Sequence, residues 1–589
     1  MLQRISRAAL AALLLASVAS ALAHGDDHED MNMEMDMGDS HEHAQPDTNN
    51  DSPLSYFAYG QYTGWIVAHI ALMVVAWCFV LPTAVMFSIA RSRLALLSQF
   101  VFLVLNAVGL FVGIVYNTQT PDLYENNTHH KIGWVATWVI AAQIVMALIF
   151  AYAGRGEKAE NAYEHAQFLP VSTDDMVESP TTFPAGIRHE YRWSRDSGQG
   201  TERNTASLHS RASSSCPSPS DEYDGFEKPE EDIPEQPSES RGFMRTGVLD
   251  RFLAHRVPAL VSARALRILS FVYNVIDRLI LLLGTIALVT GCVTYGGIFR
   301  DREIFNGLAH FIKGGIFFWY GILTLGRMMG CWADLGWAWN VKPPREIVGW
   351  KANVRSGEFT ESAVIFSYGV SNVFLEHLGG WGGAWTATDF EHVSIAVLFF
   401  GGGLCGMLFE SRRLKSWLNN TILRAPTHLE AETAHAWSAP DTQEVSLNPM
   451  PALIILLLGM MMGGHHQTSM VSSMVHKSWG NMLIGFALAR GVTYVLMYLK
   501  PPSSYLPSRP PTEIVASFCL ISGGLIFMLS ARNVVEALEY YELDAMFATS
   551  LAMGLTVFIM AWEIIVISIK AWAVKRQARP RLTPYRFPA

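Results

Sequence analysis

The chain has 589 residues, of which 50% are hydrophobic and only 16% are charged, whereas soluble globular domains carry about 25% charged residues. The formal net charge is −9, and Lys and Arg form no basic stripe of the kind that binds nucleic acid. The six cysteines are scattered without a CxxC pair, which argues against a disulfide framework or a thiolate zinc site. These features exclude a soluble multidomain protein and a nucleic-acid partner, and they indicate a multi-pass membrane protein.

The N-terminal segment, residues 1–23, has the pattern of a secretory signal peptide. Arg4 and Arg7 precede an apolar run, and small residues precede the expected cleavage point. Cleavage there leaves an extracytoplasmic arm, residues 24–60, in which ten Asp or Glu and no Lys or Arg lie between positions 24 and 51. We therefore expect a protein of the secretory pathway, in the plasma membrane or in a vacuolar or other endomembrane.

The arm alternates imidazole and thioether side chains in a pattern that favours copper, because soft sulfur ligands select Cu(I) and imidazole also accepts Cu(II). The alternative is an acidic, solvated tail in which the methionines have no role. The candidate metal ligands of the arm are His24, His28, Met31, Met33, Met35, Met37, His41 and His43.

Eleven apolar segments are long enough to be considered as membrane crossings of about 30 Å. The sixth and eighth are the shortest. The segments lie near residues 65–90, 94–116, 132–153, 268–297, 304–326, 361–378, 391–411, 449–464, 477–499, 512–531 and 546–572. The sequence thus predicts an all-α, multi-pass transmembrane helical bundle of eleven helices, with the lipid bilayer as its main partner.

The positive-inside rule gives this bundle a direction. With the N-terminus outside, every second loop is cytoplasmic, and these loops carry most of the Lys and Arg residues of the membrane region. The predicted topology is N-out/C-in. It places the glycosylation sequons at Asn50 and Asn126 outside, where glycosylation requires them.

A segment of different composition, residues 155–247, separates the first three helices from the rest. It is rich in Ser, Pro and Glu, cannot bury enough apolar surface to fold, and is predicted to be a disordered cytoplasmic linker with possible kinase sites. The linker divides a three-helix unit, residues 61–154, from an eight-helix unit, residues 268–575. Residues 248–267 are expected to form an amphipathic helix on the membrane surface, and residues 576–589 a basic cytoplasmic tail.

Thirteen of the 19 histidines fall on the outer side of this topology, and ionisable residues in membrane segments are functional by default. The alternative is that each hydrogen-bonds a neighbour at a helix end. The candidate metal ligands of the larger unit are His310, His377, His392, His465, His466 and His476. Arg490, Glu513 and Glu563 are candidates for a polar path through the membrane, with structural ion pairing as the alternative.

The three-helix unit offers a haem site. His69 lies about 6 Å inside the outer edge of the first helix, and His129 and His130 begin the third helix from the same side. Two imidazoles on two helices at similar depth can ligate a b-type haem iron from both faces. We expect His69 and His130 to be the axial ligands, with His129 beside them.

Two resemblances follow from these residues. Residues 65–77 (WIVAHIALMVVAW) and 130–134 (HKIGW) resemble the transmembrane core of the cytochrome b-561 family, which holds two haems with two histidine pairs on four helices; here three helices supply one pair. The larger unit resembles the fungal YTP-like integral membrane family. The stretches that carry this second resemblance are 309–318 (AHFIKGGIFF), 336–340 (GWAWN), 448–453 (NPMPAL), 465–467 (HHQ), 510–513 (PPTE) and 517–528 (SFCLISGGLIFM).

Three functions are compatible with these features. The first is haem-dependent electron transfer at the outer face. In that case the protein is a transmembrane haem oxidoreductase that reduces Cu(II) or Fe(III). The second is extracytoplasmic copper binding or transport without haem. The third is a structural or sorting role regulated through the linker.

Overall fold

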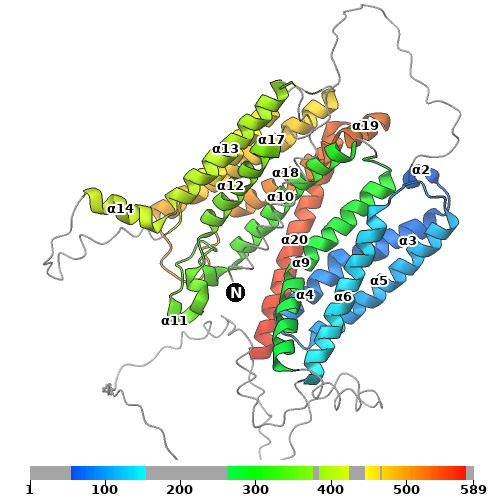
Figure 1. Ribbon diagram of the computed structural model, residues 1–589, viewed down its shortest axis with the longest axis horizontal. Coiled ribbons are helices and arrows are strands. Elements are labelled where there is room, and N and C mark those ends of the chain that lie inside the picture. The colour runs from blue at the N-terminus through cyan, green and yellow to red at the C-terminus, as the bar shows by residue number, and fades with distance from the viewer. Residues whose placement is uncertain are drawn as a thin grey trace, which may run out of the picture. The chain divides into compact units, whose positions relative to one another are not determined.

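The computed structural model describes residues 55–153, 262–300, 303–375, 384–385, 387–422, 445–464, 467 and 469–578. All regular secondary structure in these residues is helical (Figure 1). Nine of the described helical segments are long and apolar enough to cross a membrane. The predicted all-α membrane bundle is therefore confirmed. The predicted signal peptide and linker, and most of the arm, of the expected surface helix and of the basic tail, lie outside the described residues.

All eleven predicted segments are helical in the structure. The first is α3 (Thr63–Val74), η1 (Val75–Val80) and α4 (Leu81–Ile89) in succession; the others are α5 (Leu94–Gln119), α6 (Thr128–Ala153), α9 (Ala263–Gly296), α10 (Glu303–Met329), α12 (Gly357–Leu375), α13 (Ala387–Phe409), α16 (Met450–Gly463), α17 (Met470–Leu499), α18 (Thr512–Leu529) and α20 (Ala545–Ala578). The two that are not among the nine candidate spans are α12 and α16, which correspond to the shortest predicted segments.

The first crossing is continuous but changes its helical geometry in the middle. Between α3 and α4, residues Val75–Val80 form a π-helix, and Pro82 follows at the start of α4. Proline has no N–H to donate and its ring crowds the preceding turn. The π-turn therefore lies directly before the point where this proline interrupts the regular ladder of backbone hydrogen bonds.

The N-terminal bundle consists of α3, η1, α4, α5, α6 and α9. Trp77, Phe102, Ile140 and Ile280 meet in one buried apolar cluster, which joins four crossings. The sequence argument grouped the helix at 268–297 with the larger unit, whereas in the structure α9 packs against α6 and α4. Its apolar face, including Ile280, completes the core that the first three crossings leave open.

The C-terminal bundle contains α10, α12, α13, α16, α17, α18 and α20. Glycines allow a close helix crossing in this bundle, where α10 lies beside α18 (Figure 1). A Cβ at Gly314 would lie 2.6 Å from the carbonyl oxygen of Gly524, and one at Gly524 would lie 2.5 Å from that of Gly314. Small residues at a membrane helix crossing let the backbones approach closely, so these two positions admit no side chain without a shift of the helices.

The last helix, α20, connects the two bundles. It packs against α10, α17 and α18 on one side and against α4 on the other. Trp562 of α20 donates from Nε1 to the carbonyl oxygen of Cys78 (2.8 Å), and its ring lies 5.1 Å from that of Phe79. The C-terminal crossing is therefore part of the interface with the first crossing.

Contacts between loops agree with the predicted alternation of sides. Tyr124 donates to the carbonyl oxygen of Ile298 (2.8 Å), and Phe299 donates to Asn533 Oδ1 (3.1 Å); the topology assigns all these loops to the outside. Val341 donates to the carbonyl oxygen of Ser504 (2.9 Å), between two loops assigned to the cytoplasm. Which side faces the cytoplasm remains a prediction of the charge pattern.

Short helices lie before the first crossing and between later crossings, and the sequence argument did not identify them. Two of them, α14 and α19, are strongly amphipathic helices in charged stretches that were interpreted as loops. The short helices are α2 (Tyr56–Tyr59), η3 (Ala333–Leu335), α11 (Arg345–Val348), η4 (Gly349–Asn353), α14 (Arg412–Ile422) and α19 (Arg532–Tyr540).

Candidate functional site

Two histidines of the N-terminal bundle face each other across the space between α3 and α6. The ring centroids of His69 and His129 are 6.4 Å apart, and the ring planes are at 79°. His69 Nδ1 lies 2.8 Å from the carbonyl oxygen of Gly109, and His129 Nδ1 lies 2.9 Å from that of Ala287. Because a carbonyl oxygen only accepts, each Nδ1 carries the proton and each Nε2 has a lone pair available to a ligand.

Glycines on the neighbouring helices provide the room for both rings. A Cβ at Gly113 of α5 would lie 2.7 Å from His69 Nδ1, and a Cβ at Gly291 of α9 would lie 3.0 Å from His129 Cε1. Each imidazole therefore packs against a backbone position where a side chain would displace it. The pair is held in place by two carbonyl oxygens and two glycines.

This donor set fits the iron of a b-type haem. Metal-ligating histidines almost always donate their second ring N–H to a carbonyl, carboxylate or water, which fixes the tautomer and ring orientation. Both His69 and His129 make that bond, and both come from apolar membrane helices, as axial ligands of a buried haem do.

The structure places His129, rather than His130, opposite His69. The sequence argument favoured His130, but His130 is exposed and its ring lies beside Trp134, with centroids 6.4 Å apart. Successive residues of an α-helix point about 100° apart. His129 therefore faces the bundle interior, and His130 points away from it.

A second pair of histidines meets in the C-terminal bundle. The rings of His310 of α10 and His476 of α17 have centroids 6.3 Å apart and planes at 88°. His476 is buried, and its Nδ1 donates to the carbonyl oxygen of Ser472 (2.9 Å). Phe527 lies against His310, with ring centroids 5.5 Å apart, and stacks on Trp479. Two of the predicted metal ligands thus come together in an aromatic environment.

Of the other predicted ligands, only His392 lies among the described residues. His392 is half-buried near the start of α13, and no three His, Cys, Asp or Glu side chains among the described residues gather closely enough to hold a metal ion. Asn126 lies in the exposed loop between α5 and α6, accessible as its sequon requires. The candidates outside the described residues are His24, His28, Met31, Met33, Met35, Met37, His41, His43, Asn50, His377, His465 and His466.

A buried ion network lies at the end of α10 and the start of α12. Arg327 contacts Glu358 (Nη2 to Oε1, 2.7 Å) and Glu361 (Nη1 to Oε1, 2.5 Å). Its Nε donates to the carbonyl oxygen of Trp337 (2.8 Å). All three nitrogens of this guanidinium therefore have partners. The sequence argument missed the three charged residues because they lie at the edges of predicted crossings, where charged side chains usually reach water.

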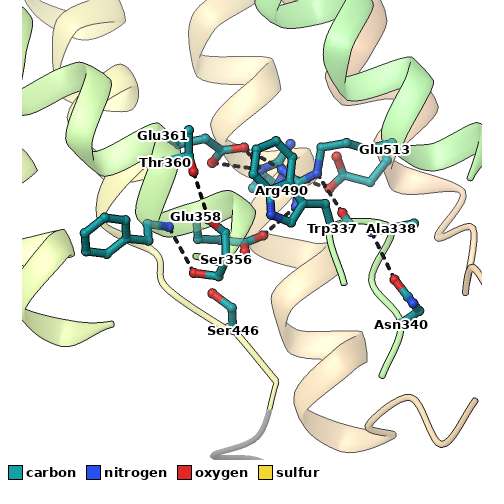
Figure 2. Close-up of polar contacts among 12 residues, drawn as sticks. Trp337, Ala338, Asn340, Ser356, Glu358, Thr360, Glu361, Ser446, Arg490 and Glu513 are labelled. Carbon is teal, nitrogen blue, oxygen red and sulfur yellow. Dashed lines mark hydrogen bonds and ion pairs between the residues drawn. The ribbon is translucent and has the colours of Figure 1, made fainter. Parts of the chain in front are cut away.

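The network continues to α17 and α18 (Figure 2). Arg490 pairs with Glu513 (Nε to Oε1, 2.8 Å) and contacts Glu361 at 3.4 Å. Trp339 lies against both guanidinium groups, with its ring centroid 4.4 Å from Cζ of Arg327 and 5.3 Å from Cζ of Arg490. Structural ion pairing, the alternative stated for Arg490 and Glu513, accounts for their burial.

Several polar atoms at this network have no hydrogen-bond partner among the described residues. They include Arg490 Nη2, Glu513 Oε2 and the hydroxyls of Tyr320 and Tyr494. Buried polar groups are nearly always paired, and polar sites of this kind hold water. The network is therefore a polar region in the interior of the C-terminal bundle.

Comparison with known proteins decides the family. Residues 283–571 match the family model described as protein YTP1-like, C-terminal, and residues 50–153 match a domain of unknown function, DUF2427. An uncharacterized membrane protein of Schizosaccharomyces pombe is 32% identical over 91% of this chain and 99% of its own length. The chain belongs to the YTP1-like family.

Two relatives in Saccharomyces cerevisiae match parts of this YTP1-like protein. An uncharacterized membrane protein is 39% identical over 47% of this chain and 44% of its own length, and Protein YTP1 is 22% identical over 46% and 49%. No solved structure matches. The predicted YTP-like membership is confirmed, and these names support a multi-pass membrane protein. Neither matching family model is described as a cytochrome, so the resemblance to cytochrome b-561 remains an inference from the residues.

Proposed function

We propose that this YTP1-like protein is a membrane redox protein that binds one b-type haem between His69 and His129. The proposal depends mainly on the facing imidazoles, whose Nδ1–H groups are both bonded to backbone carbonyls. Helix-borne histidine pairs are a usual way to hold haem iron in a membrane. When bound, such a haem supplies a one-electron couple.

The chain's own groups would position and tune this site. The carbonyl oxygens of Gly109 and Ala287 hold each ring in the tautomer that presents Nε2, and hydrogen bonding of this kind raises ligand basicity. His129 is the second residue of α6, so the pair lies near the end that the topology assigns to the outside. An oxidised metal ion such as Cu(II) or Fe(III) at that face is the proposed electron acceptor, and the secretory-pathway membrane is its proposed location.

Three single substitutions test this proposal. The full-length chain, purified in detergent, is expected to show a reduced-minus-oxidised absorbance difference typical of b-type haem. His69→Ala and His129→Ala should remove it, because each deletes one axial ligand. His130→Ala is the matched control, since it deletes an imidazole one position away that points out of the bundle. A spectrum that survives His129→Ala but not His130→Ala would refute the assignment.

A second candidate function is copper handling at the outer face without haem. The observation that favours it is the pair His310 and His476, near the side on which the topology places the His- and Met-rich arm. Copper analysis of the purified chain after dialysis tests it, with His476→Ala as the variant and His130→Ala, an exposed histidine of the N-terminal bundle, as the control. Copper content should fall in the first only; equal copper content in both variants would contradict this function.

A further inference from the structure

A buried carboxylic acid occupies the interior of the N-terminal bundle, away from the histidine pair. Asp277 of α9 is 4% exposed and lies within a helix that is long and apolar enough to cross the membrane. Neither the haem proposal nor the copper proposal uses it. An ionisable side chain in such a position marks a proton or ion site more often than a structural one.

The bonds around Asp277 come from three crossings. Ser88 of α4 donates to its Oδ2 (2.7 Å), and Gln143 of α6 donates to its Oδ1. Ser88 Oγ is also 2.9 Å from the hydroxyl of Tyr273, which accepts from Gln99 Nε2 of α5 (3.0 Å). Four polar residues therefore surround one carboxyl group and link it into a single chain of hydrogen bonds.

Neutral groups alone contact this carboxyl among the described residues. The elements packed around it contribute Ser88 from α4, Gln99 from α5 and Gln143 from α6, none of which is charged. On α9 itself the titratable neighbour is Tyr273, and Arg278 follows in sequence but is exposed. A buried carboxylate without a paired cation is costly, and such groups take up a proton instead.

The same series of hydrogen bonds can form whether Asp277 is ionised or protonated. When the carboxyl is ionised, Ser88 and Gln143 both donate to it. When Oδ2 carries a proton, it donates to Ser88 Oγ, and Ser88 in turn donates to the hydroxyl of Tyr273, because a hydroxyl can rotate to donate or accept. Asp277 thus gains or loses a proton without leaving a bond unmade.

We propose that Asp277 is a proton-binding site that exchanges with water through Ser88 and Tyr273. Ser88 is the penultimate residue of α4, and Tyr273 is half-buried one turn before Asp277. The relay therefore leads to the end of the bundle that the topology assigns to the cytoplasm. A proton entering on Asp277 balances the negative charge of an electron entering the bundle; this last step alone rests on the proposed function.

Infrared spectroscopy of the full-length chain in lipid nanodiscs tests the site without any need for haem. The chain should show a protonated-carboxyl C=O stretching band at mildly acidic pH that shifts in D₂O. Asp277→Asn should remove one component of this band. Glu346→Gln, which changes an exposed carboxyl on α11, should not. A spectrum in which Asp277→Asn removes no component of this band overturns the proposal, whether or not the chain binds haem.

A second measurement tests the proposal even if Asp277→Asn does not fold. Dicyclohexylcarbodiimide modifies buried protonated carboxyls, because the carboxyl O–H adds across one C=N bond with no leaving group. After treatment of the chain without substitutions, mass spectrometric peptide mapping should find the adduct on Asp277. Ser88→Ala, which keeps the carboxyl but interrupts the relay, should slow the D₂O shift of the infrared band. No adduct on Asp277 at neutral or acidic pH, or unchanged exchange in Ser88→Ala, would contradict the proposal.

Discussion

Removing the carboxylate of Glu513 should strongly destabilise the C-terminal bundle. Its side chain is 0% exposed and that of Arg490 is 1% exposed, and their ion pair spans 2.8 Å. Among the described residues, Glu513→Gln leaves the guanidinium with Glu361, at 3.4 Å, as its remaining carboxylate partner. Breaking a buried pair by removing one partner costs about 3–5 kcal/mol, which lowers the folded-to-unfolded ratio by roughly two to four powers of ten.

The unfolding free energy can be measured by titrating the detergent-solubilised chain with sodium dodecyl sulfate and following tryptophan fluorescence. Glu536→Gln is the matched control, because it breaks the exposed Arg532–Glu536 pair, whose side chains are 61% and 53% exposed. Exposed i,i+4 pairs contribute only about 0.3–0.5 kcal/mol. Equal losses in the two variants would refute the view that the network stabilises the bundle.

Three further predictions concern the haem pocket, a peripheral carboxyl and the arm. Gly113→Ala should lower haem content, because its Cβ would displace the His69 ring, whereas Gly133→Ala, with open space around it, should not; pigment absorbance checks this, and equal content would contradict it. Burial raises the pKa of Glu410, beyond the end of α13, so this group contributes stability at low pH that is lost as pH rises through its folded-state pKa. Glu410→Gln should remove that pH dependence from unfolding curves, and an unchanged dependence would contradict the assignment. A peptide of residues 24–43 titrated with Cu(I) should lose its affinity when the four arm methionines become Leu, since only thioether sulfur is a soft ligand; equal affinity would exclude a copper role for them.

The crossings could be predicted from the sequence because a long apolar run has one stable state in a bilayer. Hydropathy located all eleven helices, including the two short ones, α12 and α16, that are not among the nine candidate spans. It could not assign α9 to a bundle, since apolar helices have similar surfaces and their partners depend on side-chain fit. The packing of Ile280 with Trp77 and Phe102 is visible only in three dimensions.

The candidate site was predicted in kind but not in detail. Sequence reasoning located the helices that carry His69 and His129, yet it favoured His130. Which of the two neighbouring histidines faces the interior depends on the rotation of α6 about its axis, which is set by packing against α9 and cannot be read from the sequence. The partners of Arg327 could not be found either, since Glu358 and Glu361 follow it by about thirty positions. Residues that are this far apart in the sequence and lie on different helices show no periodic pattern that would reveal their contact.

The haem content of the purified full-length chain tests the central claim most directly. The pyridine haemochrome assay, combined with amino-acid analysis, gives the number of haem groups per polypeptide. We expect close to one haem b per chain in the unmodified protein and in His130→Ala, and none in His129→Ala. A folded, monodisperse chain that contains no haem after expression with excess haem precursor would contradict the claim.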